Sequence, residues 1–271
     1  MAAPAYEAHV TAAPAITLAC CGLFGTTVVD DGLVERAFAE AIATQGVVTG
    51  TAAYARGMAD VHRARGQATG DMMHILFPDN AARAQAAHLA FDRSLSQAVG
   101  RFGPQPMPGA REVLDRLAGT GVRICLFAGV SRRLLGQVLG GLGWQARVDL
   151  ALSADDVPRG CPAPDLVLAA MLRLGVTDVR ETAVVAGTAS VILAGRRAGA
   201  GIAAGVLTGT HPAAKLRQAG ATHVLTSIAE LPAVLAAYPP AVADDTNRLL
   251  AKAPGTAGNR PAKSPCVSGS L

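Results

Sequence analysis

The stretch LACCGLFGTTVVDDG, residues 18–32, decides the fold of this chain. It begins with a short apolar run, which is typical of a buried strand in a parallel sheet. A Gly-Thr-Thr turn follows, and open α/β sheets bind their ligands beyond the carboxyl ends of the strands. Such a turn usually carries a catalytic acid, but this strand ends in Gly22 and the first acids are Asp30 and Asp31.

The hydrophobic period changes after this stretch. Between residues 31 and 104 apolar residues recur at three- and four-residue steps, which predicts an all-helical insertion whose last helix is capped by Asn80. From residue 105 strand-like and helix-like runs alternate, which predicts an α/β fold with a doubly wound parallel sheet. The predicted parts are an N-terminal arm (1–14), an α/β core (15–30 and 105–238), a helical cap (31–104) and a disordered tail (239–271).

The composition narrows the class of protein. Apolar residues make up 51% of the 271 residues, which indicates a globular protein with a sizeable core. The basic residues behind the net charge of +4 are scattered, and no apolar run approaches the ~18 residues of a membrane span, so we expect neither a nucleic-acid nor a membrane partner. Five cysteines without a regular spacing favour a reducing, cytoplasmic location. No lysine precedes Lys215, which excludes amine chemistry from the first 214 residues.

Four strings together resemble the haloacid dehalogenase (HAD) superfamily, and within it the phosphonatase-like hydrolases. The strings are GLFGTTVVDDG, RGCPAPDLVL, VVAGTASVILAGRRAGAG and VLTGTHPAAKLRQAGATHVLTSIAELP. The resemblance implies a Rossmann-like (Rossmannoid) core with a helical cap inserted after the first strand. It also implies phosphoryl transfer by a strand-end Asp, with Mg²⁺ held by carboxylates and with a hydroxyl and a cation on the phosphoryl oxygens. In phosphonatases the cap adds a Schiff-base lysine.

The resemblance, carried over to this sequence, places uncharged residues at the functional positions. The position of the nucleophile falls on Gly22, and the residue two further on is Phe24. The positions of the phosphate-binding hydroxyl and of the base fall on Ala128 and Cys161. Those of the two metal-binding acids fall on Gly187 and Val191, and that of the cap lysine falls on Thr69. Loss of a nucleophile typically costs about 10⁶ in rate, and Mg²⁺ requires oxygen ligands. We therefore predict that phosphoryl transfer is absent and that neither Mg²⁺ nor another metal is a cofactor.

The same positions predict an uncharged, largely apolar cavity beneath the cap. Either the cavity is open and Gly22, Phe24, Ala128, Cys161 and Thr69 line a ligand site, or it is filled by Phe24 and its neighbours. Asp30 or Asp31 either folds back into this cavity or caps the first cap helix. Cys161 is either a thiol nucleophile or an inert buried side chain.

These alternatives leave three functions open. The first is a non-hydrolytic pseudoenzyme that binds a small molecule or a partner protein not yet identified, with a homodimer as one possible assembly. The second is a repurposed, metal-free enzyme that acts on an uncharged or apolar substrate in the capped cavity. The third is a HAD-family hydrolase of phosphate esters or phosphonates.

Overall fold

The computed structural model describes residues 15–238, and its centre is a six-stranded parallel sheet. The strand order is β3-β2-β1-β4-β5-β6, so the chain winds outward in both directions from β1. This confirms the predicted doubly wound fold. The predicted N-terminal arm (1–14) and disordered tail (239–271) lie outside the described residues. The strands are β1 (Leu18–Gly22), β2 (Arg123–Ala128), β3 (Leu150–Ser153), β4 (Thr182–Ala186), β5 (Ile202–Val206) and β6 (His223–Leu225).

Strand β1 lies in the middle of the sheet and is buried along its whole length. Its side chains alternate between two apolar clusters, with Leu18 and Cys20 on one face and Ala19 and Cys21 on the other. Helices cover both faces, which explains why the strand reads as a continuous apolar run. The carboxyl ends of β1, β2 and β4 lie side by side, because β1 pairs with both of the other strands.

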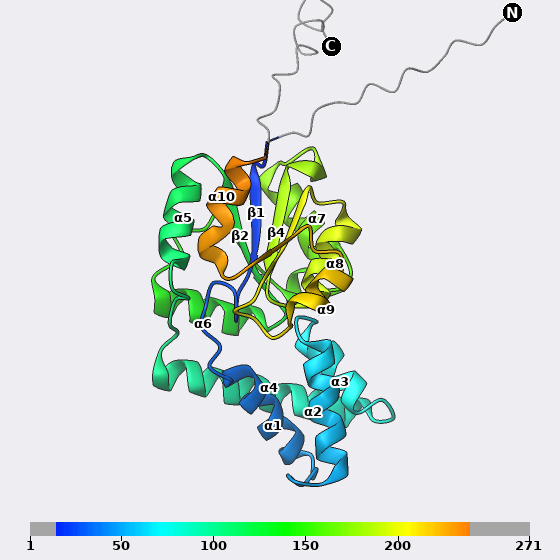
Figure 1. Ribbon diagram of the computed structural model, residues 1–271. Coiled ribbons are helices and arrows are strands. Elements are labelled where there is room, and N and C mark those ends of the chain that lie inside the picture. The colour runs from blue at the N-terminus through cyan, green and yellow to red at the C-terminus, as the bar shows by residue number, and fades with distance from the viewer. Residues whose placement is uncertain (1–14, 239–271) are drawn as a thin grey trace, which may run out of the picture.

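The helices of the core divide between the two faces of the sheet, as Figure 1 shows. Helices α5 (Ala110–Gly119), α6 (Arg132–Leu142) and α10 (Leu231–Ala236) bury apolar residues in the cluster on one face. Helices α7 (Asp165–Leu174) and α8 (Ala189–Ala198) pack on the other face, and α9 (Ala213–Gln218) packs beside α8. Three short 3₁₀ helices connect these elements: η1 (Ala154–Asp156), η2 (Val179–Glu181) and η3 (Ile228–Glu230).

The insertion after β1 consists of four helices, which lie within the range predicted for the cap. They are α1 (Leu33–Thr44), α2 (Ala52–Ala64), α3 (Thr69–Leu76) and α4 (Ala81–Phe102). The rings of Phe38 and Phe91 join α1 to α4 with their centroids 4.4 Å apart. The side chain of Asn80 accepts a hydrogen bond from the backbone N–H of Arg83 at 2.9 Å, which confirms the predicted cap of α4.

The cap covers the carboxyl ends of the strands. Figure 1 shows α1 to α4 grouped at that end of the sheet, with α5 and α10 along one side of the core. The edge at which α/β sheets bind ligands therefore faces the cap. Among residues 15–238, no helix combines the length and the apolar character that a membrane span requires.

Candidate functional site

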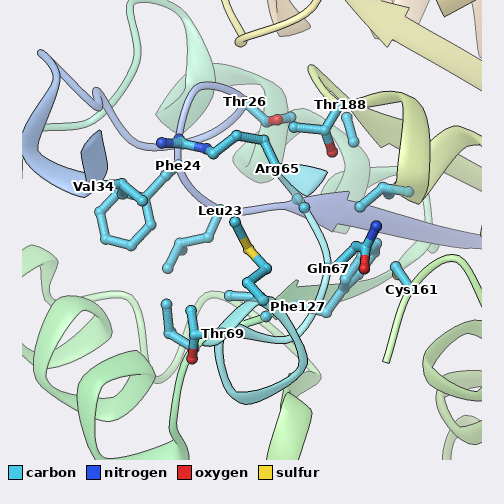
Figure 2. Close-up of a pocket in the computed structure, with 18 of the residues that line it drawn as sticks. Leu23, Phe24, Thr26, Val34, Arg65, Gln67, Thr69, Phe127, Cys161 and Thr188 are labelled. Carbon is cyan, nitrogen blue, oxygen red and sulfur yellow. The ribbon is translucent and has the colours of Figure 1, made fainter. Parts of the chain in front are cut away.

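A small cavity lies between the carboxyl edge of the sheet and the cap. Its volume is about 80 Å³, well below the ~300 Å³ at which sites for drug-sized ligands begin. Because this volume remains with Phe24 along one side, Phe24 does not fill the cavity completely. The structure brings together in its lining six of the seven residues singled out from the sequence: Gly22, Phe24, Thr69, Ala128, Cys161 and Val191. Figure 2 shows Cys161 and Phe24 on opposite sides of this cavity.

The seventh residue, Gly187, touches a neighbouring loop instead. A Cβ atom added to Gly187 would lie 2.3 Å from the Cα atom of Gly209, closer than two such atoms can approach. The backbone N–H of His211 also donates to the carbonyl oxygen of Gly187 at 3.1 Å. Main chain therefore fills the space that a side chain at position 187 would need.

The end of β1 is packed less tightly. A Cβ atom added to Gly22 would lie 3.2 Å from the hydroxyl oxygen of Thr26 and 3.3 Å from Cβ of Ala186. The Thr26 hydroxyl oxygen accepts a hydrogen bond from the backbone N–H of Gly187 at 3.2 Å, and the Thr27 hydroxyl donates to the carbonyl of Gly22 at 2.9 Å. The two threonines thus fix the turn after β1 and join it to the end of β4.

The residues at these strand ends do not fit the Mg²⁺ that the family resemblance implies. Mg²⁺ requires hard oxygen ligands, usually including carboxylates. Gly22, Gly187 and Val191 offer no side-chain oxygen, and Gly187 has no room for one. In the part of the chain that the structure describes, no three His, Cys, Asp or Glu side chains group closely enough to hold a metal ion.

Asp30 and Asp31 lie outside the small cavity. Asp30 accepts a hydrogen bond from the backbone N–H of Val34 at 3.0 Å, in the first turn of α1, and its other oxygen lies 2.5 Å from the guanidinium of Arg65. Asp31 is exposed. Both line a second cavity of about 330 Å³, also between core and cap. The alternative in which one of them folds back into the small cavity is therefore wrong, because helix capping and the ion pair hold Asp30 elsewhere.

Cys161 lines the small cavity, and its thiol is held in its neutral form. The residue is only 3% exposed, and burial raises the pKa of this thiol to about 12. Burial also raises the pKa of Cys21, and the neighbouring Cys125 and burial together raise that of Cys20. Since the thiolate is the reactive form, these surroundings favour an inert Cys161 over a nucleophile.

The loop between α2 and α3 closes the cavity from the cap side. The Ser190 hydroxyl donates to the carbonyl of Arg65 at 2.7 Å, and the backbone N–H of Thr69 donates to the carbonyl of Gly129 at 2.8 Å. A Cβ atom added to Gly129 would lie 2.1 Å from the carbonyl oxygen of Gln67, so the two backbones are in direct contact. The loop is therefore docked on the ends of β2 and α8. The Thr69 hydroxyl lies 3.0 Å from Nε2 of His88 on α4, which fixes it within the cap.

His211 forms another link between core and cap. Its ring is 2% exposed, and its Nδ1 accepts the backbone N–H of Ala189 at the start of α8, at 2.8 Å. Its Nε2 lies 3.0 Å from the carbonyl oxygen of His62 on α2 and 3.0 Å from Nζ of Lys215. Because Nδ1 is an acceptor, the neutral ring carries its proton on Nε2 and donates it to the cap.

Arg65 is the charged cavity-lining residue that the sequence pattern missed. It is 8% exposed and lines both cavities. The prediction of an uncharged cavity is therefore wrong at this one side chain. No local signal identifies Arg65, since it stands in an ordinary amphipathic helix end and its partner Asp30 lies 35 residues earlier.

A model of the haloacid dehalogenase-like hydrolases matches residues 16–199 of this chain. The phosphonoacetaldehyde hydrolase of Bordetella pertussis is 30% identical over 185 residues, which cover 56% of this chain and 67% of that protein. The enzyme of the same name from Vibrio cholerae is 28% identical over 155 residues, which cover 48% of this chain and 57% of that protein.

Solved structures agree on the fold. A phosphonoacetaldehyde hydrolase-like protein from Oleispira antarctica aligns with a TM-score of 0.74 at 23% identity, over 92% of this chain and 99% of that chain. A hydrolase from Pseudomonas syringae aligns with a TM-score of 0.69 at 24% identity, over 81% of this chain and 98% of that chain. From the family match, the phosphonatase-like strings and the capped parallel sheet, we conclude that this chain belongs to the haloacid dehalogenase-like hydrolase family, on its phosphonatase-like branch.

Proposed function

We propose that this protein is a non-hydrolytic member of the family, and that it binds a small uncharged molecule in the cavity between core and cap. The observation that carries the proposal is the contact between Gly187 and Gly209. A hydrolase of this family would need a metal-binding acid at position 187, and here a neighbouring backbone occupies that space. The Mg²⁺-dependent reaction therefore lacks both a ligand and the room for one.

The rest of the cavity supports the same proposal. Gly22 and Ala128 carry neither a nucleophile nor a hydroxyl, and the Cys161 thiol is held neutral by burial. Apolar side chains form most of the lining, and enclosed apolar cavities favour uncharged ligands. The same neutral thiol argues against the thiol-based version of a repurposed enzyme.

Hydrolysis of a phosphonate is the competing function, and the names of the relatives favour it. The test is a turnover assay with Mg²⁺, a generic phosphate monoester and phosphonoacetaldehyde. The Bordetella pertussis phosphonoacetaldehyde hydrolase serves as the positive control. We expect no turnover above the buffer rate at enzyme concentrations a thousandfold above those that suffice for the control.

The purification is part of the design, since trace phosphatases give false turnover. Activity that elutes with this chain through two orthogonal columns, and that disappears with EDTA, would refute the non-hydrolytic proposal. A Gly22→Asp variant sharpens the result. The Cβ atom of the new side chain needs only small shifts of Thr26 and Ala186, and we expect the variant to stay inactive because positions 187 and 191 supply no metal ligand.

A further inference from the structure

Arg65 lies between the two cavities beneath the cap. It follows the last residue of α2 and lines both the cavity of about 80 Å³ and the cavity of about 330 Å³. Figure 2 shows its side chain running along one wall of the smaller cavity, with the guanidinium near Phe24. Among the described residues that line this smaller cavity, Arg65 is the only one with a charged side chain.

The core fixes this arginine at both ends. Its carbonyl oxygen accepts the Ser190 hydroxyl at 2.7 Å, and its guanidinium lies 2.5 Å from the carboxylate of Asp30. The other Asp30 oxygen is held by the backbone N–H of Val34 at 3.0 Å. The guanidinium therefore has a defined position before any ligand arrives, as a preorganised recognition group requires.

The guanidinium has more donors than the protein uses. An arginine side chain carries five N–H donors, and for residues 15–238 Asp30 is the one hydrogen-bond partner recorded for this guanidinium. The side chain is only 9% exposed, yet its remaining nitrogens are not among the fully buried polar atoms that lack a hydrogen-bond partner in residues 15–238. These N–H groups therefore keep access to water, which a ligand oxygen placed beside them would replace as the acceptor.

The charges around Arg65 determine which ligand suits it. Asp30 already neutralises the guanidinium, and Asp31 and Glu35 add negative charge along the second cavity. An anionic ligand in the small cavity would compete with Asp30 for the guanidinium, whereas a neutral acceptor oxygen gains a charge-assisted hydrogen bond without displacing Asp30. The small cavity is about half the size of the ~150 Å³ cavity that accommodates benzene, so its ligand has roughly three to four non-hydrogen atoms.

We propose that Arg65 is the recognition residue of the small cavity, and that it donates a hydrogen bond to the oxygen of a small neutral carbonyl compound. This inference rests on the proposed binding function. It adds the chemical class of the ligand and the residue that selects it.

Two probes of the same shape test the proposal. Acetone and 2-methylpropene each have four non-hydrogen atoms, but only acetone has an acceptor oxygen. The chain is labelled with ¹⁵N and titrated with each probe, and NMR follows the backbone amides of Ala128 and Gly129 together with the Nε–H signal of Arg65. We expect acetone to bind at least about tenfold more tightly than 2-methylpropene and to shift the Nε–H signal of Arg65.

Three variants separate recognition from folding. Arg65→Met should reduce the affinity for acetone to that for 2-methylpropene. Arg63→Met, two residues earlier on an exposed side chain, should leave both affinities unchanged. If Gln67→Met abolishes the preference for acetone while Arg65→Met retains it, the amide of Gln67 is the recognition group and the proposal is wrong. If Arg65→Met does not fold, the Nε–H signal of Arg65 in the wild-type chain still shows whether acetone binds beside the guanidinium.

The outcomes distinguish this inference from the proposed function. If neither probe binds, the cavity is not a binding site and both proposals fail. If both probes bind with equal affinity and the Nε–H signal does not move, the binding function stands and the role of Arg65 is overturned.

Discussion

The core and the cap contribute different things to the cavity between them. The core supplies strand ends without functional side chains at Gly22 and Ala128, and at Gly187 a neighbouring backbone fills the space. The cap supplies an ordered loop whose polar groups are tied down, from Arg65 to the backbone of Thr69. The one charged side chain in the lining of the small cavity, Arg65, thus comes from the loop that covers the sheet.

In both the core and the cap loop, two main chains lie in close contact at a glycine. Gly187 lies against Gly209 within the core, and Gly129 at the end of β2 lies against the carbonyl of Gln67 in the cap. Each glycine leaves room for a backbone where another protein would place a side chain. Interiors are densely packed, so a side chain at either position would displace a loop.

The largest effect that we predict concerns the core thiols. A pKa of about 12 for Cys161, against an ordinary value of 9.0, reduces its thiolate fraction about 10³-fold. In a Cys266→Ser background, we expect iodoacetamide to modify Cys161 at least about 10³-fold more slowly in the native chain than in urea. Peptide mapping by mass spectrometry provides the rates, and a Cys161→Ala variant identifies the peptide. Rapid alkylation of Cys161 in the native chain would contradict this prediction and show that its thiol is reactive.

The second prediction tests the packing of the core half. Gly187→Ala adds a Cβ atom 2.3 Å from Cα of Gly209, and overpacking of this kind costs about 3 kcal/mol of the free energy of unfolding. Gly136→Ala is the matched control, because a Cβ atom on this residue of α6 meets nothing within 4 Å and should gain up to about 1 kcal/mol. Urea unfolding measures both. A Gly187→Ala variant as stable as the wild type would show that the core retains room for an acid.

The strands and the core half of the site could be predicted from the sequence because their signals are local. A continuous apolar run marks β1, and the resemblance to the haloacid dehalogenase superfamily predicts that Gly22, Ala128 and Cys161 lie at the functional positions of the fold. The position of Asn80, directly before a segment with helical periodicity, predicts that it caps that helix. These features depend on neighbours within a few residues.

The cap half could not be predicted, since its contacts join distant residues. Asp30 pairs with Arg65 across 35 positions, and His211 reaches the carbonyl of His62 across 149. The contact at Gly187 was equally hidden, because a glycine in a motif does not reveal that another loop lies against it. The sequence therefore predicts the uncharged strand ends, but it does not predict that Arg65 lies beside them.

The third prediction concerns the ion pair that ties the cap loop to the core. Arg65→Met removes one partner of a pair whose side chains are 9% and 20% exposed, and we expect a loss of about 2 kcal/mol in the free energy of unfolding. The control is Arg63→Met, whose ion pair with Asp60 involves an arginine side chain 71% exposed and should contribute less than about 0.5 kcal/mol. Equal losses in the two variants would mean that the loop is not held by Arg65.

The smallest effect is the pH dependence of the link at His211. Burial lowers the pKa of His211 from its ordinary value of 6.5, and the charges of Lys215, His62 and Arg65 lower it further, against the raising effect of the hydrogen bond to the carbonyl of His62. Protonation would place an N–H on Nδ1 opposite the N–H of Ala189, so the folded state resists it. The unfolded chain binds this proton more readily. The stability that the link contributes is therefore complete above about pH 6.5 and is lost as the pH falls below that value.

A glutamine at position 211 isolates this contribution. Its amide can accept from Ala189 and donate to the carbonyl of His62, but it does not titrate. Between about pH 7.5 and about pH 5.5, we expect the melting temperature of the wild type to fall further than that of His211→Gln. The difference should be a few degrees at most, since a single proton is involved. The exposed His74, replaced by glutamine, controls for histidines elsewhere in the cap. If His211→Gln and the wild type lose stability in parallel, His211 does not couple proton binding to the contact between core and cap, and the cap half of the cavity depends on the Arg65 loop alone.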